Sequence, residues 1–172
     1  ILLQREDLRI VVLGSGESDH EKYFQWLRDT YPDKVAVYRG YNNELAHRIE
    51  GGADVFLMPS RYEPCGLTQM IAMRYGTLPL VHRTGGLADT VTPVSPDGGE
   101  GSGFVFTDYA PASFATAVAE AVARFGDQAA WQSIKQRLVE SALAQPRVFV
   151  HRDYHSRNLM RLEQDNPGIL DF

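Results

Sequence analysis

The chain of 172 residues is long enough to bury a sizeable core, and its 44% hydrophobic and 23% charged residues are typical of a single globular domain. A net charge of −5 argues against a surface for nucleic acid or acidic membrane. The single cysteine excludes an internal disulfide and indicates a reducing, cytoplasmic compartment, and no apolar run reaches the roughly 18 residues of a membrane span.

Short apolar runs alternate with amphipathic segments along most of the chain. The runs predict strands at residues 8–13, 34–38, 54–58, 78–82 and 104–106. The segments between and after them, ended by glycine or proline, predict helices at 19–31, 43–50, 66–75, 111–125 and 128–143. This alternation predicts an α/β fold with a Rossmann-like, doubly wound parallel sheet. The run 8–13 is nearly continuous and predicts a strand that is buried on both faces.

The pattern changes after Leu143, so we predict one domain over residues 1–143 and an appendage over 144–172. Pro146 ends the last helix, and 148–150 reads as a new strand. Residues 158–162 and 168–172 predict a hairpin across the turn Gln164-Asp165-Asn166-Pro167. The chain opens mid-pattern without a methionine, and we expect it to be a piece of a longer protein.

The loop after the third strand carries residues that suit an anionic sugar ligand. In an open parallel sheet, ligands bind outside the carboxyl ends of the strands. Glu63 lies in this loop, and the predicted helix beginning at Gly66 offers unpaired amide groups to a phosphate. Thr68 adds a hydroxyl, and an ionised Glu63 accepts hydrogen bonds from sugar hydroxyls. The combination indicates a phosphate-linked sugar as the ligand.

The stretch "DVFLMPSRYEPCGLTQMIAMRYGTLPLVHRTGGLADTV" resembles the signature of bacterial glycogen synthases and plant starch synthases. These are retaining glucosyltransferases that use ADP-glucose. The similarity runs over roughly residues 1–142 and implies the C-terminal, nucleotide-sugar-binding half of a two-domain GT-B enzyme. On this resemblance Glu63 is the catalytic residue that contacts the glucose hydroxyls, and Tyr41 packs against adenine. The residues placed around ADP-glucose are Gly14, Gly16, Tyr41, Cys65, Gly66, Leu67, Thr68, Thr84 and Gly85.

Several of these residues have simpler interpretations. Glu63 can cap the start of the predicted helix, and Tyr41 can be ordinary surface packing. Cys65 is expected to be a small wall residue rather than a nucleophile, because no activating group lies near it in the sequence. His47 and His82 lack partners at ligand spacing, so we expect solvated or core histidines and no metal site.

The resemblance also implies parts that this chain does not contain. The family has an N-terminal domain, and an arginine and a lysine that grip the diphosphate; none of these can be assigned here. We therefore expect ADP-glucose or ADP as ligand with no further cofactor, and an α-glucan partner only if the missing domain is supplied. A cleft face left uncovered favours self-association. The alternative is a non-catalytic chimeric module whose inherited sites are relics.

The tail "VFVHRDYHSRNLM" resembles the catalytic loop of aminoglycoside phosphotransferases and choline kinases. The resemblance rests on His151, Asp153 and Asn158, followed by Asp171 in "GILDF". In a whole kinase, Asp153 is the catalytic base, and Asn158 and Asp171 hold magnesium. No ATP-anchoring lysine or glycine-rich cover accompanies them. We predict that these residues are structural passengers at the end of a chimeric chain.

Overall fold

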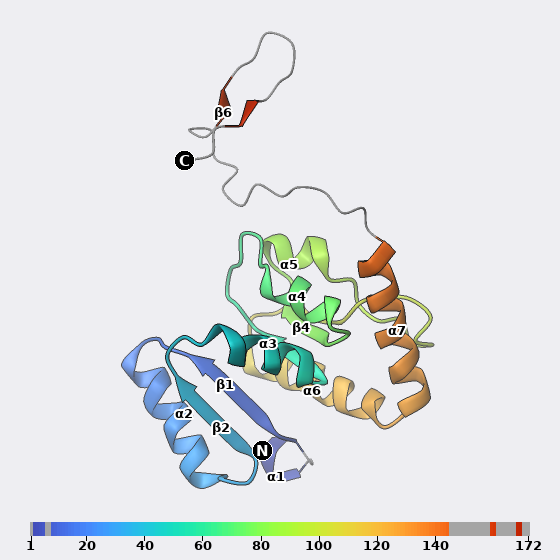
Figure 1. The fold of residues 1–172 in the computed structure, drawn as a ribbon. Coiled ribbons are helices and arrows are strands. Elements are labelled where there is room, and N and C mark those ends of the chain that lie inside the picture. The colour runs from blue at the N-terminus through green and yellow to red at the C-terminus, as the bar shows by residue number, and fades with distance from the viewer. Residues whose placement is uncertain (1, 6–7, 145–158, 161–167, 170–172) are drawn as a thin grey trace.

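The computed structural model describes residues 2–5, 8–144, 159–160 and 168–169, and Figure 1 shows how its elements are arranged. Its strands are β1 (Ile10–Gly14), β2 (Val35–Arg39), β3 (Val55–Met58), β4 (Leu78–His82), β5 (Phe104–Phe106), β6 (Leu159–Met160) and β7 (Gly168–Ile169). Its helices are α1 (Leu2–Arg5), α2 (Ser18–Thr30), α3 (Asn43–Gly52), α4 (Thr68–Arg74), α5 (Gly85–Thr90), α6 (Pro111–Phe125) and α7 (Gln128–Ala144). The five strands predicted before residue 144 are all present, and α1 and α5 are additions that the pattern did not predict.

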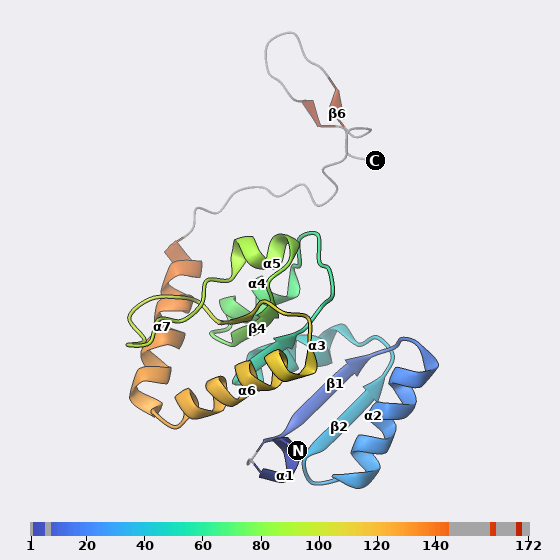
Figure 2. The ribbon, with the colours of Figure 1, turned by 180° about the vertical axis from the view of Figure 1, so that it is seen from behind.

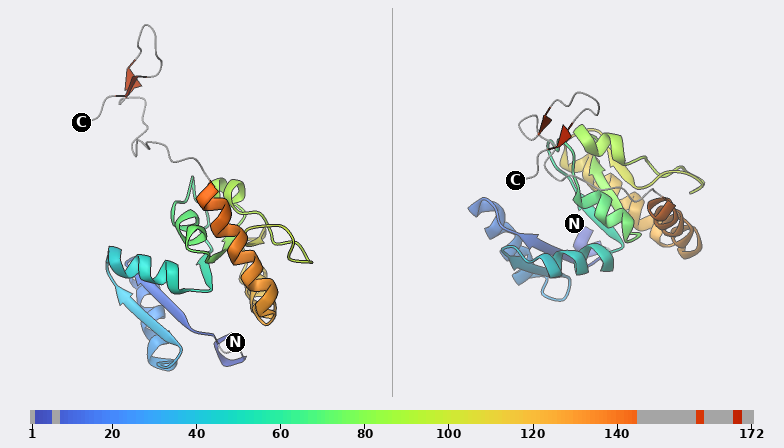
Figure 3. Two further views of the ribbon diagram at one scale, coloured as in Figure 1. Left: turned by 45° about the vertical axis from the view of Figure 1, so that its right-hand side comes forward. Right: turned by 45° about the horizontal axis from the view of Figure 1, so that its top comes forward.

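The first five strands form two parallel sheets. β1 pairs with β2, whereas β4 lies between β3 and β5. All of these pairings are parallel, which confirms the α/β class and the Rossmann-like alternation of strands and helices. The sequence pattern predicts a single sheet, but no pairing among the described residues joins β1 to β3. Figure 3 shows the β1–β2 pair as a unit beside the rest of the molecule.

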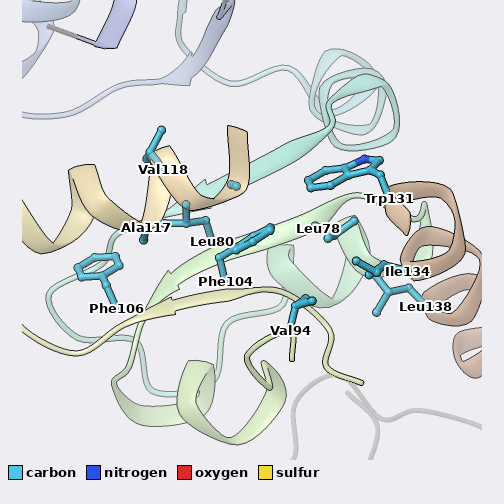
Figure 4. Packing of buried hydrophobic residues seen from close by; sticks show 11 residues of the cluster. Leu78, Leu80, Val94, Phe104, Phe106, Ala117, Val118, Trp131, Ile134 and Leu138 are labelled. Carbon is cyan, nitrogen blue, oxygen red and sulfur yellow. The ribbon is translucent and has the colours of Figure 1, made fainter. Parts of the chain in front are cut away.

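The three-stranded sheet carries the main core. All five residues of β4 are buried, because β4 has a strand on each side and helices against its faces. Leu78 and Leu80 pack with Phe104 of β5 against α6 and α7, as Figure 4 shows. The ring of Phe104 stacks on that of Trp131 at 6.0 Å between centroids. This packing fixes the loops that leave the carboxyl ends of the strands.

Helices α6 and α7 cover this sheet with residues at helical spacing. Pro111 occupies the start of α6, where its missing N–H leaves no hydrogen bond unmade. Ala117 and Ala121, four residues apart, face the core from α6. Trp131 and Ile134 do the same from α7 and are almost fully buried. The alanine-rich sequence of α6 lets it lie close to the sheet.

The two-stranded sheet is much less buried. Helix α2 packs beside β2 (Figure 2), and Leu27 of α2 forms a small cluster with Val35 and Leu3. The prediction that the first strand is buried on both faces is wrong, since the side chain of Val11 is 52% exposed. The apolar pattern of β1 correctly predicts a strand, but it does not specify which neighbouring elements cover that strand.

Only two short strands of the tail belong to the described residues. Leu159 pairs with Ile169 and Met160 with Gly168 in an antiparallel ladder, which agrees with the predicted hairpin. The predicted strand at 148–150 lies outside the described residues. So do the four kinase-like positions, His151, Asp153, Asn158 and Asp171.

Candidate functional site

The loop after β3 and the turn after β4 are packed backbone against backbone. The N–H of Gly86 donates a hydrogen bond to the carbonyl oxygen of Glu63 at 3.0 Å. A Cβ added at Gly85, whose φ is +44°, would lie 2.1 Å from that same oxygen. One added at Gly86 would lie 2.3 Å from the carbonyl oxygen of Cys65. Only glycine allows this approach, so the Thr84-Gly85-Gly86 turn fixes the backbone position of Glu63 and Cys65.

Gly66 does not begin a helix, which corrects the prediction from the sequence. Helix α4 begins two residues later, at Thr68, and Gly66 adopts a φ of +70° that favours glycine. The group that lies against Gly66 is the side chain of Gln69. A Cβ at Gly66 would be 2.4 Å from the Oε1 atom of Gln69. The side-chain amide of Gln69 therefore occupies the space that a Cβ at position 66 would need.

Gln69 is a positioning residue that the sequence did not reveal. Its side chain is fully buried, and its Nε2 donates to the carbonyl oxygens of Gly66 at 2.6 Å and Cys65 at 3.2 Å. Nε2 also lies 3.1 Å from Oγ1 of Thr90, at the end of α5. The amide thus links the Cys65–Gly66 turn to the helix after β4. A glutamine in a predicted amphipathic helix carries no signal that it will be buried.

His82 joins three strand ends. It closes β4, and its Nδ1 lies 3.0 Å from the carbonyl oxygen of Ser60, in the loop after β3. Its Nε2 lies 3.2 Å from the carbonyl oxygen of Thr107, just after β5. The ring packs between those of Phe106 and Tyr109. His82 is a core histidine, one of the two interpretations that the sequence allowed, and it holds the Glu63 loop to the sheet.

The side chains of this loop are presented outward. Cys65 is exposed and Leu67 is 66% exposed, whereas Glu63 is half-buried. Within the described part of the chain the Glu63 carboxylate makes no hydrogen bond, so it does not cap α4. The hydroxyl of Thr68 donates to Sδ of Met58 at 3.5 Å. The Glu63 carboxylate is therefore available to a ligand, while the loop backbone is held by hydrogen bonds to Gly86 and His82.

A second group of predicted site residues lies on the two-stranded sheet. The N–H of Gly40 donates to the carbonyl oxygen of Gly14 at 3.0 Å, which places the Gly14–Gly16 turn beside Tyr41. Tyr41 is 86% exposed, and its hydroxyl donates to Oδ1 of Asn43 at 3.3 Å. Such an exposed ring is available for stacking. It is not buried in ordinary side-chain packing.

The Gly16 turn already holds a carboxylate. The N–H of Gly16 donates to Oε1 of Glu21 at 3.2 Å, and Arg39 pairs with the other oxygen. The Gly16 hydrogen bond, and then the positive charge of Arg39, lower the pKa of Glu21. The Gly16 N–H and the Arg39 guanidinium are thus both engaged by the carboxylate of Glu21.

The structure brings the predicted residues into two groups, not one. Glu63, Cys65 and Gly85 belong to the first, and Gly16 and Tyr41 to the second. No hydrogen bond or ion pair connects the two groups in the part of the chain that the structure describes. A surface hollow of about 420 Å³ lies elsewhere, between the C-terminal end of α4 and α7, and no predicted site residue lines it. We therefore place the candidate site at the strand ends rather than in that hollow.

Residues 1–137 match the family described as glycosyl transferases, group 1. The chain belongs to this family. A glycogen synthase of Desulfitobacterium hafniense is 52% identical to this glycosyl transferase chain over 136 residues, 78% of the chain and 29% of the relative. A glycogen synthase of Bacillus cereus (strain ATCC 10987) is 45% identical over 154 residues, 86% of the chain and 32% of the relative. The chain thus spans less than a third of the length of either relative.

Solved structures show the same relationship. The catalytic domain of starch synthase IV from Arabidopsis thaliana, bound to ADP and acarbose, matches with a TM-score of 0.69 and 32% identity. That match covers 78% of this chain and 30% of the starch synthase chain. Anabaena HepE, solved with UDP-glucose, matches 82% of this chain and 38% of its own at a TM-score of 0.61. Its identity is 17%, so it supports the fold alone.

Among the residues that the structure describes, no helix combines the length and the apolar character needed to cross a membrane. Within the same residues, His, Cys, Asp and Glu side chains nowhere gather in threes to hold a metal ion.

Proposed function

We propose that the chain is the ADP-glucose-binding half of a retaining glucosyltransferase that elongates an α-1,4-glucan in the cytoplasm. The observation that carries the proposal is the Glu63–Cys65 loop, held on the Gly85–Gly86 turn with its carboxylate free. Further support comes from the glycogen synthase relatives and from the starch synthase IV structure, which contains ADP. An α-glucan acceptor would also need a second domain, as the resemblance implies.

Six of the predicted residues have specific roles in this proposal. The Glu63 carboxylate accepts hydrogen bonds from glucose hydroxyls and stabilises positive charge that develops at the sugar. Cys65, Leu67 and Thr68 form the wall beside the sugar and diphosphate. Tyr41, with its exposed ring, stacks on adenine. The backbone N–H of Gly66 approaches the diphosphate from the turn just before α4, a turn that Gln69 holds through the Gly66 carbonyl.

The direct test compares ADP-glucose with ADP as ligands. We expect Glu63→Gln to weaken ADP-glucose binding about tenfold, because an uncharged amide accepts sugar hydroxyl hydrogen bonds less strongly. ADP carries no glucose, so its affinity should change less than about twofold. Isothermal titration of the 172-residue chain measures both. Glu100→Gln, at an exposed loop position, is the matched control and should change neither affinity. Equal losses for both ligands in the Glu63 variant would contradict the assignment.

A non-catalytic module is the second candidate, and one observation favours it. Among the described residues no hydrogen bond or ion pair joins the Gly16–Tyr41 group to the Glu63 group, so a ligand would have to bridge them. In a module of this kind the inherited nucleotide-sugar residues are relics, and it would transfer no glucose. A glucosyl-transfer assay with ADP-glucose and glycogen, run with and without an added N-terminal domain from the Desulfitobacterium relative, separates the two. Transfer restored by the added domain supports the enzyme half, and binding without any transfer supports the module.

The kinase-like residues of the tail have no catalytic role in this proposal. His151, Asp153, Asn158 and Asp171 match a kinase catalytic loop, but phosphoryl transfer depends on positioned ATP and bridging metal. We expect no magnesium-dependent ATP turnover, and the same ADP affinity in the Asp153→Asn variant as in the parent. Turnover that disappears in Asp153→Asn would revive the kinase interpretation.

A further inference from the structure

One oxygen of the buried Gln69 side chain is left without a hydrogen bond. Oε1 of Gln69 is buried and accepts no hydrogen bond among the described residues. The opposite orientation of the amide would set Oε1 against the carbonyl oxygens of Gly66 and Cys65, which are acceptors themselves. The oxygen therefore stays unpaired so that the Nε2 group can hold these two carbonyls.

Stability alone does not explain a glutamine at this position. A buried polar atom without a partner destabilises the folded state, and in a native protein it calls for a reason. Methionine has a similar length and would fill the same space without a polar oxygen. What the Gln69 amide supplies, and methionine would not, is a hydrogen-bond donor that lies between two turns of the candidate site.

The hydroxyl of Thr90 connects this amide to the turn after β4. It accepts a hydrogen bond from Nε2 of Gln69 at 3.1 Å and donates one to the carbonyl oxygen of Gly86 at 2.7 Å. The N–H of Gly86 in turn donates to the carbonyl oxygen of Glu63. A continuous path of hydrogen bonds therefore joins the backbone of Glu63 to the Gln69 amide, which holds the carbonyl of Gly66.

The path is anchored to the core through α5, the helix that ends at Thr90. Leu87 of α5 and Val91, directly after the helix, are buried and pack in one cluster with Val81 of β4. Close packing of this kind leaves a short helix little freedom to move. The Thr90 hydroxyl therefore keeps the two turns that it connects at a constant separation.

We propose that the Thr90 hydroxyl and the Gln69 amide are positioning groups that make the site selective for a nucleoside diphosphate carrying a sugar. The inference rests on the proposed function, in which Glu63 meets the sugar and Gly66 meets the diphosphate. A ligand that contacts both turns depends on their separation. A nucleoside diphosphate without a sugar contacts only the Gly66 turn, so its affinity does not depend on that separation.

The experiment begins with Thr90→Val, which removes the hydroxyl and keeps the branched shape of the side chain. Gln69 still holds the carbonyl of Gly66, but its connection to Gly86 is lost. We expect ADP-glucose binding to weaken about fivefold, the effect of one hydrogen bond, and ADP affinity to change less than about twofold. Isothermal titration of the 172-residue chain measures both. Thr90→Ser keeps a hydroxyl and should restore the parent affinities.

Gln69→Met tests the other end of the path. It removes both the connection to Thr90 and the hold on Gly66, so ADP binding should weaken about fivefold and ADP-glucose binding about twenty-five-fold. The ratio of the two affinities should be the same in the double variant Thr90→Val/Gln69→Met, because a shared path can be broken only once. A ratio that falls further in the double variant would contradict the path.

Thr116→Val is the matched control. The Thr116 hydroxyl donates to the carbonyl oxygen of Ala112 at 3.0 Å, the same kind of bond at an exposed position of α6, and its loss should change neither affinity. Circular dichroism checks that each variant folds, and Gln69→Met tests the ratio should Thr90→Val not fold. Equal losses for ADP and ADP-glucose in Thr90→Val, or no loss for either, overturn the inference. Equal losses in Glu63→Gln would instead contradict the proposed function itself.

Discussion

The three-stranded and two-stranded halves of the protein contain strands of similar sequence but bury them to very different extents. β4 (LPLVH) is buried along its whole length, between two strands and beneath helices. β1 (IVVLG) has no fully buried residue, although it is just as apolar. The difference shows that apolar composition specifies a strand, whereas its neighbours determine how much stability that strand contributes.

The same contrast applies to the two groups of site residues. Glu63 and Cys65 are held by buried or tightly packed groups, namely Gln69, His82 and Gly86. Gly16 and Tyr41 lie on the less buried half, in contact mainly with surface residues. We infer that the Glu63 group, the proposed sugar end of the site, is held rigidly, whereas the position of Tyr41, the proposed adenine contact, depends on the less buried sheet.

A matched pair of valines provides the strongest test of the contrast. Val81→Ala in β4 should lower the free energy of unfolding by about 3 kcal/mol, since it leaves a cavity in a closed core. Val11→Ala in β1 should lower it by less than about 1 kcal/mol, because half of that side chain is already in water. Urea unfolding monitored by circular dichroism measures both. Equal losses of unfolding free energy in the two variants would mean that β1 is as well covered in solution as β4.

Substitutions at two glycines test whether the Glu63 group is packed more tightly than the Gly16 group. Gly85→Ala forces a Cβ onto the Glu63 carbonyl at a positive φ, and should cost about 2 kcal/mol of folding stability. Gly16→Ala meets nothing within 4 Å and should change stability by less than about 0.5 kcal/mol. The same urea titrations measure these losses. A Gly85 variant as stable as the parent would show that the two loops are not locked together.

The smallest expected effect is the pH dependence that Glu21 contributes. Its pKa is lowered in the folded state by the Gly16 N–H and by Arg39. Its stabilising contribution is therefore complete above the ordinary glutamate pKa, and it is lost as the pH falls through the lowered folded value. The difference in stability between the parent and Glu21→Gln should shrink as the pH falls from about 6 to about 3. A difference that stays constant over this range would contradict the assignment.

The sequence predicts the helices and strands better than it predicts their burial and their side-chain contacts. β4 and β5 follow directly from apolar runs, and α6 from an amphipathic segment ended by glycine, and all three are present at the predicted residues. The exposure of β1 could not be predicted, because it depends on which strands lie beside it. The roles of Gly66 and Gln69 were also missed, since a buried amide that folds back on its own turn leaves no periodic pattern. The motif identified Gly85 and Glu63, but only the structure revealed that their backbones lie against each other.

The measurement that tests the account most directly is a titration of the isotope-labelled chain with ADP, followed by amide chemical shifts. If the two halves form one nucleotide-sugar site, amides of both groups must respond, including Gly16 and Tyr41 on one side and Cys65 and Gly85 on the other. We expect the four amides to shift together along one binding curve. Shifts confined to one group, or located at the hollow between α4 and α7, would contradict the account.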